Sequence, residues 1–232
     1  MRDVPGKGRK REVAARSIQV ATAVGTADAE LSHPVGAPTG LLVLGHGAGG
    51  GIDAPDLLAV TSAALDAGIA VARVRQPYSV AGRRAPAPAA QLDVGWTAVV
   101  DHLGTVLRAE WPELRVVVGG RSSGARVACR TAATTGAVGV LALAFPLHPP
   151  GHPEKSRAPE LDVAVPLLVM QGARDPFGGP DQFPPHVAVY EVTGADHRLS
   201  GPALAPAVAV AIDWLSATLA SGEGIEPRST AL

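Results

Sequence analysis

Short runs of apolar, largely β-branched residues alternate along the chain with longer stretches of helical character. The runs that predict strands lie near residues 17–24, 41–47, 69–75, 115–119, 138–144, 166–171 and 187–192, and those that predict helices near 55–67, 91–109, 123–134 and 203–219. Continuous apolar strands separated by helices are typical of a parallel sheet that is covered on both faces. The pattern therefore predicts an α/β fold, with a doubly wound, mostly parallel sheet of about seven to eight strands and helices on both faces.

The length of 232 residues fits one domain, which we expect to span residues 16–220. The polar, basic segment 1–15 is predicted to be a disordered tail, and segment 221–232 a flexible C-terminal tail. Apolar residues make up 47% of the chain and charged residues 18%, which is typical of a globular protein with a large core.

The charge balance and the cysteine content argue against several classes of protein. A net charge of −1 argues against a general nucleic-acid binder. The single cysteine, Cys129, cannot form an internal disulfide, so a reducing cytoplasm is expected. The longest apolar runs reach only about ten residues, too few to cross a bilayer, and the basic N-terminus lacks the apolar stretch of a secretory signal.

A glycine-rich pentapeptide, Gly120 to Gly124, follows the strand predicted at 115–119 and precedes a predicted helix. It matches the G-x-S-x-G pattern with Ser122 in the central place. In that pattern the serine is a nucleophile on a strained strand-to-helix turn, and the glycines avoid collisions with neighbouring backbone. The alternative is a plain turn in which a serine caps the helix.

Two later loops contain the partners that an activated serine needs. Asp175 follows the strand at 166–171 and His197 follows the last predicted strand, which gives the chain order Ser, Asp, His. We predict His197 as the base and Asp175 as the acid that orients it, with Asp181 as the reserve acid. Asp196 adjoins His197 in sequence, and because neighbouring side chains in an extended loop usually diverge, Asp196 is a poor choice for the acid that orients it.

Backbone donors for an oxyanion are expected from two places. Ser123 begins the helix after the nucleophile, and its N–H is one expected donor. The glycine-rich segment LGHGAGGG, residues 44–51, should provide the second, with the N–H of Ala48 favoured over that of Gly47. A phosphate-binding loop is the alternative for this segment, but it fits neither common phosphate motif. No compact metal-ligand spacing is present in the sequence, so no metal is expected.

The core, at about residues 16–219, resembles the α/β-hydrolase superfamily. More narrowly, it is similar to a small, lidless family related to the dienelactone hydrolases, which includes testis-expressed hydrolase-like proteins and a subunit of the NSL chromatin complex. The resemblance rests on the segments LGHGAGG, QPYSVAGRR, GGRSSG, FPLHPPGHPEK and QGARDPFG. It implies a triad of Ser122, Asp175 and His197. The family often has methionine where this chain has Ser123, and the dienelactone hydrolases themselves use a cysteine nucleophile, so their substrate does not carry over.

Only about twenty residues separate the strands predicted at 138–144 and 166–171, too few for a helical cap domain, so an open, shallow cleft is expected. The residues expected at its substrate rim are His46, Tyr78, Arg83, Arg84 and His148. Together with Arg121 and Arg126, the two rim arginines raise the hypothesis of a basic rim that binds an anionic group of the substrate. Solvated arginines without such a role are the favoured alternative.

These inferences predict a serine hydrolase that acts on carboxylic esters through an acyl-enzyme. The alternatives are a thioesterase, a peptidase or an acyltransferase on the same fold, or a non-catalytic interaction protein. We expect a cytoplasmic monomer or homodimer that needs no cofactor and acts on a small-molecule ester, without binding nucleic acid or membrane.

Overall fold

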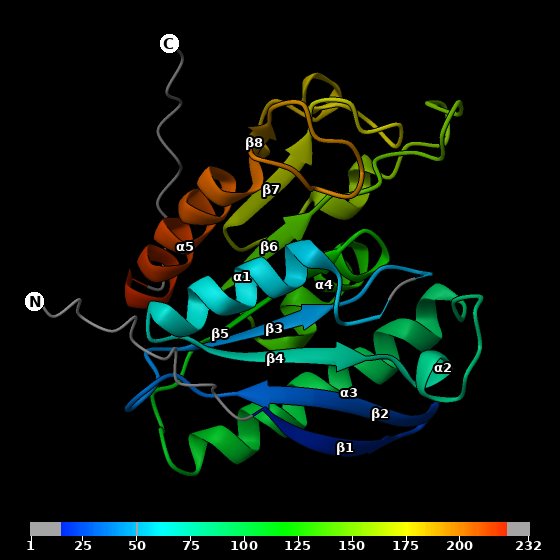
Figure 1. The fold of residues 1–232 in the computed structure, drawn as a ribbon. Helices are drawn as coiled ribbons and strands as arrows, with labels where there is room; N and C mark the ends of the chain where they lie inside the picture. Colours follow the sequence, from blue (N-terminus) through cyan, green and yellow to red (C-terminus); the bar gives the residue numbers. More distant parts are fainter. Residues whose placement is uncertain (1–14, 50, 222–232) are drawn as a thin grey trace, which may run out of the picture.

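The computed structural model describes residues 15–49 and 51–221 of the chain. Its centre is one eight-stranded sheet in the order β1-β2-β4-β3-β5-β6-β7-β8 (Figure 1). The strands are β1 (Arg16–Thr22), β2 (Gly25–Ser32), β3 (Leu41–Gly45), β4 (Ala70–Arg75), β5 (Val116–Arg121), β6 (Gly139–Leu143), β7 (Leu167–Gly172) and β8 (Ala188–Val192). All neighbouring strands from β4 to β8 pair in parallel, whereas β2 pairs antiparallel with both β1 and β4.

Helices cover both faces of the sheet, and each face has its own apolar core. The α-helices are α1 (Pro55–Asp66), α2 (Pro77–Val80), α3 (Ala89–Arg108), α4 (Ser123–Thr135) and α5 (Leu204–Ser221), with 3-10 turns η1 (Ala158–Leu161) and η2 (Pro180–Gln182). Helices α1 and α5 pack on one face, and α3 and α4 on the other (Figure 1). Central strands such as β3 are buried along their whole length, because apolar residues point into both cores.

The predicted fold class is confirmed, but the sequence pattern missed one strand. The segment Gly25–Ser32 is rich in alanine and acidic residues, which have low strand propensity. Its alternate residues Ala27, Ala29 and Leu31 are buried against α3. Glu30, on the other side of the strand, pairs with Arg73 of β4 at 2.6 Å. Pairing on both edges and burial of one face hold this segment as a strand despite its composition.

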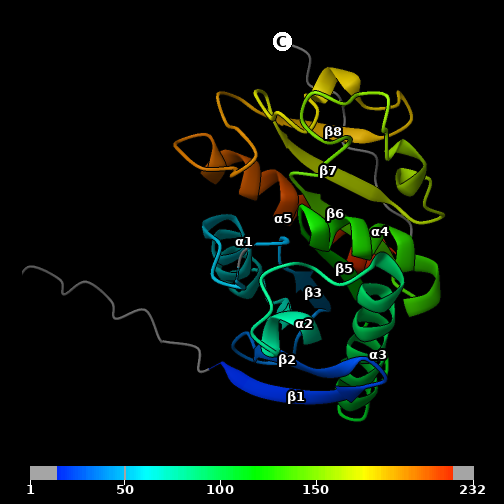
Figure 2. The ribbon, with the colours of Figure 1, turned by 90° about the vertical axis from the view of Figure 1, so that its right-hand side faces the viewer.

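The crossover between β6 and β7 contains only the single turn η1, as the sequence predicts for a protein without a cap. Two arginines of α4 hold this turn. Arg126 Nε donates to Glu160 at 2.8 Å, and Arg130 reaches both Glu160 and Asp93 of α3. The short connection leaves the carboxyl ends of the strands without a covering domain, and Figure 2 looks onto this edge of the sheet.

The expected domain limits of 16–220 stay a prediction. The tails predicted at 1–15 and 221–232 lie, except for residues 15 and 221, outside the described part of the chain. None of the helices described here has both the length and the hydropathy needed to cross a membrane.

Candidate active site

Ser122 sits on a sharp turn between β5 and α4. Its backbone has φ of 52° and ψ of −112°, a combination that residues other than glycine rarely adopt. The flanking glycines allow this turn to press against β3. A Cβ atom added at either Gly120 or Gly124 would lie 2.4 Å from the carbonyl oxygen of Gly45. The pattern G-x-S-x-G therefore has a steric cause here. The helix-cap alternative fails, because the Ser122 side chain makes no capping hydrogen bond.

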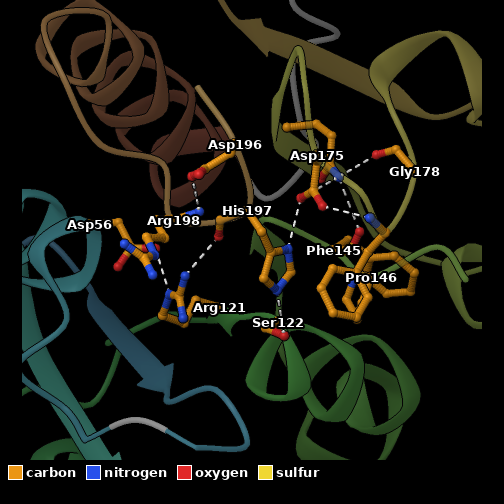
Figure 3. A network of polar contacts seen from close by, with 12 residues as sticks. Asp56, Arg121, Ser122, Phe145, Pro146, Asp175, Gly178, Asp196, His197 and Arg198 are labelled. Carbon is orange, nitrogen blue, oxygen red and sulfur yellow. Dashed lines mark hydrogen bonds and ion pairs between the residues drawn. The ribbon is translucent and has the colours of Figure 1, made fainter. Parts of the chain in front are cut away.

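The hydroxyl of Ser122 is the first member of a chain of hydrogen bonds (Figure 3). Ser122 Oγ lies 3.0 Å from Nε2 of His197, and Nδ1 of His197 lies 2.8 Å from Oδ2 of Asp175. A carboxylate can only accept, so Nδ1–H donates to Asp175 and Nε2 is left to accept the proton of Ser122. The three residues predicted as a triad come from the ends of β5, β7 and β8 and meet at one edge of the sheet.

The carboxylate of Asp175 is buried and held by two further donors. Its Oδ1 accepts the backbone N–H of Phe177 at 2.8 Å, and its Oδ2 accepts Nε2 of Gln171 at 3.0 Å. The ring of Phe177 lies over the imidazole of His197, with centroids 4.3 Å apart. Gln171 and Phe177 were not singled out from the sequence as site residues. Both lie in the segment QGARDPFG, and their closeness to Asp175 in that segment was the available signal.

Arg121 precedes the nucleophile and does not belong to a free basic rim. Its Nε donates to the buried Asp56 at 2.8 Å, and its Nη2 donates to the backbone carbonyl of His197, also at 2.8 Å (Figure 3). Arg126, the other arginine added to that hypothesis, is paired with Glu160. The hypothesis is therefore wrong for these two arginines, because carboxylates of the chain already neutralise them. No sequence pattern pointed to Asp56, which comes from the first turn of α1.

The segment predicted to bind an oxyanion lies beside the nucleophile. A Cβ atom added at Gly47 would lie 3.5 Å from Cβ of Ser122. The carbonyl of Ala48 accepts the hydroxyl of Tyr78 at 3.0 Å, which fixes the orientation of that part of the loop. Ser123 is the first residue of α4, where backbone N–H groups have no partner inside the helix. The N–H of Ser123 and the loop at Gly47–Ala48 thus lie close to Ser122.

His46 and Tyr78, both expected at the substrate rim, are buried and support this loop, and Tyr78 also lines the pocket that contains Arg83. His46 is only 3% exposed; its Nδ1–H donates to the carbonyl of Gly47 at 2.7 Å, and its Nε2 accepts the N–H of Gln76 at 3.2 Å. Burial lowers the pKa of His46, which matches a neutral ring that donates at one nitrogen and accepts at the other. The rim prediction is wrong for His46 because the ring packs beneath the loop, against Tyr78.

The other expected rim residues divide between the interior and the surface. His148 is buried, with Nδ1 at 2.9 Å from the carbonyl of Pro149 and Nε2 at 2.9 Å from Oε1 of Gln182, so its place in the rim is also wrong. These two hydrogen bonds raise its pKa, that with Gln182 most. Arg83 and Arg84 are exposed, and Arg83 lines a pocket of about 360 Å³ between α2 and the start of α3.

The remaining acids stay away from the imidazole of His197. Asp196 accepts the backbone N–H of Arg198 at 2.9 Å, and the reserve acid Asp181 lies exposed in η2. Over residues 15–49 and 51–221, no group of three or more histidine, cysteine, aspartate or glutamate residues could hold a metal ion.

Most of the chain matches one known protein family. Residues 38–206 match the family model described as the alpha/beta hydrolase domain. The chain belongs to this family. No curated protein matches the sequence of this alpha/beta hydrolase significantly.

Solved structures from several bacteria share the fold. Est1E from Butyrivibrio proteoclasticus matches with a TM-score of 0.72 at 14% identity, covering 88% of this chain and 99% of its own. A dienelactone hydrolase from Anabaena variabilis matches with a TM-score of 0.68 at 20% identity, covering 88% and 97%. A serine hydrolase without a lid from Xanthomonas campestris matches with a TM-score of 0.65 at 19% identity, covering 90% and 93%. At these identities the likeness establishes only the fold of this hydrolase.

Proposed function

We propose that this alpha/beta hydrolase is a serine hydrolase that cleaves carboxylic esters through an acyl-enzyme. The observation that carries the proposal is the chain of two hydrogen bonds from Ser122 through His197 to the buried Asp175, built on a strained turn. A serine hydroxyl is a weak nucleophile until a base takes its proton, and an imidazole acts as that base when a carboxylate holds its tautomer.

In the proposed mechanism Ser122 Oγ attacks the carbonyl carbon of the ester while its proton moves to Nε2 of His197. The N–H groups of Ser123 and Ala48 donate hydrogen bonds to the substrate oxygen and stabilise the negative charge that develops on it, with the N–H of Gly47 as the next candidate donor. The imidazolium then gives its proton to the leaving alcohol as the carbon–oxygen bond breaks. Asp175 keeps the imidazole oriented and offsets its positive charge throughout.

Water completes the cycle. His197 takes a proton from a water molecule, whose oxygen attacks the acyl carbon, and returns that proton to Ser122 Oγ as the carboxylic acid leaves. The short crossover between β6 and β7, which has no cap domain, supports the proposal that the substrate is a small-molecule ester that enters from solvent. We place the protein in the cytoplasm as a monomer or homodimer that works without a cofactor. Within the wider family, we place it with the lidless proteins related to dienelactone hydrolases, as its motifs suggest.

Labelling with a fluorophosphonate probe tests the proposal, because the probe reacts only with an activated serine. We expect wild-type protein to be labelled and the folded Ser122→Ala variant to remain unlabelled. A panel of short-chain and long-chain esters, thioesters and amides then identifies the favoured bond. A folded wild-type protein that is neither labelled nor active would overturn the proposal in favour of an interaction protein. Preference for a thioester or amide would correct the substrate class.

A further inference from the structure

Arg121 connects the two reacting residues of the proposed hydrolase. It is covalently joined to Ser122, and its guanidinium donates to the backbone carbonyl of His197 at 2.8 Å. The side chain is only 15% exposed, so this hydrogen bond from a charged donor faces little competition from water. A single residue therefore spans from the strand of the nucleophile to the loop of the base.

The position of this guanidinium is fixed by Asp56. That carboxylate is 1% exposed, and its Oδ2 accepts Nε of Arg121 at 2.8 Å. Its other oxygen, Oδ1, accepts the N–H of Leu57 at 3.0 Å in the first turn of α1. Asp56 is thus held by the start of a helix on one side and holds Arg121 on the other, so the fork of the guanidinium cannot swing freely.

The guanidinium also lies against the predicted oxyanion loop. A Cβ atom added at Gly47 would lie 3.2 Å from Nη1 of Arg121. The same planar group therefore lies beside the loop next to the nucleophile and binds the backbone of the base. Asp175 holds the ring of His197 through Nδ1, and Phe177 covers its face, but neither of them contacts the backbone of His197 in any hydrogen bond among the described residues.

We propose that Arg121, held by Asp56, is a positioning residue that sets the distance between Ser122 Oγ and Nε2 of His197. The inference rests on the proposed function. Arginine suits this place because its planar fork presents several N–H donors in fixed directions, whereas lysine provides one compact charge. Small displacements of a base from its nucleophile are costly to rate, so the backbone of His197 needs its own anchor.

The test compares Arg121→Lys, Arg121→Met and the double variant Arg121→Met with Asp56→Asn. Lysine retains a positive charge for Asp56 but cannot also reproduce the directed bond to His197. The double variant removes the charge of Asp56, so that no unpaired carboxylate is left buried if Arg121→Met alone fails to fold. Arg126→Met is the matched control, because Arg126 of α4 pairs with Glu160 of η1 and has no hydrogen bond to the loop of His197 among the described residues.

Each variant is assayed for kcat and KM on a short-chain para-nitrophenyl ester, for its rate of fluorophosphonate labelling, and for its melting temperature. We expect kcat to fall about tenfold in Arg121→Lys and about a hundredfold in the double variant, with KM nearly unchanged and the labelling rate falling in parallel. The melting temperature of Arg121→Lys should stay near that of wild type. Arg126→Met should lose stability but retain kcat.

Wild-type kcat in Arg121→Lys and in the double variant would overturn the positioning role, as would losses that match only the unfolded fraction. A proportional loss of kcat in Arg126→Met would also overturn it, because a general structural effect would then explain the result. A wild-type protein that is inactive and unlabelled would overturn the proposed function and this inference together. The two failures are therefore distinguishable by the behaviour of the wild type.

Discussion

Gly124 on α4 lies so close to Gly45 on β3 that a Cβ atom at Gly124 would be 2.4 Å from the carbonyl oxygen of Gly45. The carbonyl of Gly45 belongs to the backbone, and the position of a Cβ atom is set by its own backbone. Neither can therefore turn aside as the end of a long side chain would. This contact brings the start of α4, and with it Ser122, against the end of β3. The loop at Gly47–Ala48 leaves β3 at the same point.

The first prediction concerns this contact. Gly124→Ala should lower the free energy of unfolding by about 1–3 kcal/mol, because the added methyl group overpacks the turn, and should lower kcat by displacing Ser122. Urea denaturation and the ester assay measure the two effects. Gly49→Ala is the control, since a Cβ there meets nothing within 4 Å. Equal stability of both variants would show that the turn can relax.

A second prediction concerns the amide of Gln171, which holds Asp175. Its Nε2 lies 3.0 Å from Oδ2 of Asp175 and 2.7 Å from the carbonyl of Gly178. Gln171→Leu should lower kcat about tenfold through a looser Asp175, and lower the free energy of unfolding by about 1–3 kcal/mol because a buried carbonyl loses its donor. Thr131→Val, which deletes a buried hydroxyl on α4, is the control and should leave kcat unchanged. A stable Gln171→Leu protein with wild-type kcat would contradict the expectation.

The hydroxyl of Tyr78 supports a third prediction. It donates to the carbonyl of Ala48 at 3.0 Å and so orients the loop expected to bind the oxyanion. Tyr78→Phe should reduce kcat about tenfold with little change in KM, since the lost orientation matters most when charge develops on the substrate oxygen. Steady-state kinetics on the same ester measures the effect. Tyr190→Phe on β8 is the control and should keep its kcat.

His46 gives a prediction on pH. Burial lowers its pKa below the ordinary value of 6.5, so the unfolded chain binds a proton more readily than the folded one. The stability that depends on neutral His46 is therefore present above pH 6.5 and is lost as the pH falls toward the lower pKa of the folded state. A proton on Nε2 would also oppose the N–H of Gln76.

Urea denaturation over a pH series measures this dependence in wild type and in His46→Gln. We expect the wild type to lose stability below pH 6.5 more steeply than the variant. The difference between the two proteins isolates His46 from His148, whose raised pKa has the opposite effect, with stability lost as the pH rises. Parallel curves for the two proteins would contradict the expectation, because they would mean that the pKa of His46 is the same in the folded and unfolded states.

Local patterns were enough for most of the fold. Uninterrupted apolar runs gave the central strands from β3 to β7, because a strand buried on both faces needs apolar residues at every position. Strand β2 could not be found this way. Its alanines and acids have low strand propensity, and only its pairing with β1 and β4 gives them a strand conformation.

The sequence by itself also determined the three residues of the candidate site, since a glycine pattern, strand ends and chain order are all local or sequential features. The tertiary structure decided what supports them. Asp56 and Arg121 are 65 residues apart, and Arg121 and His197 are 76 apart, so no local pattern links them. The tertiary structure also places His46 in the interior and not at the expected rim, because burial depends on which segments pack above a residue. Contacts between distant segments are set by packing in three dimensions, and a periodicity along the chain does not contain them.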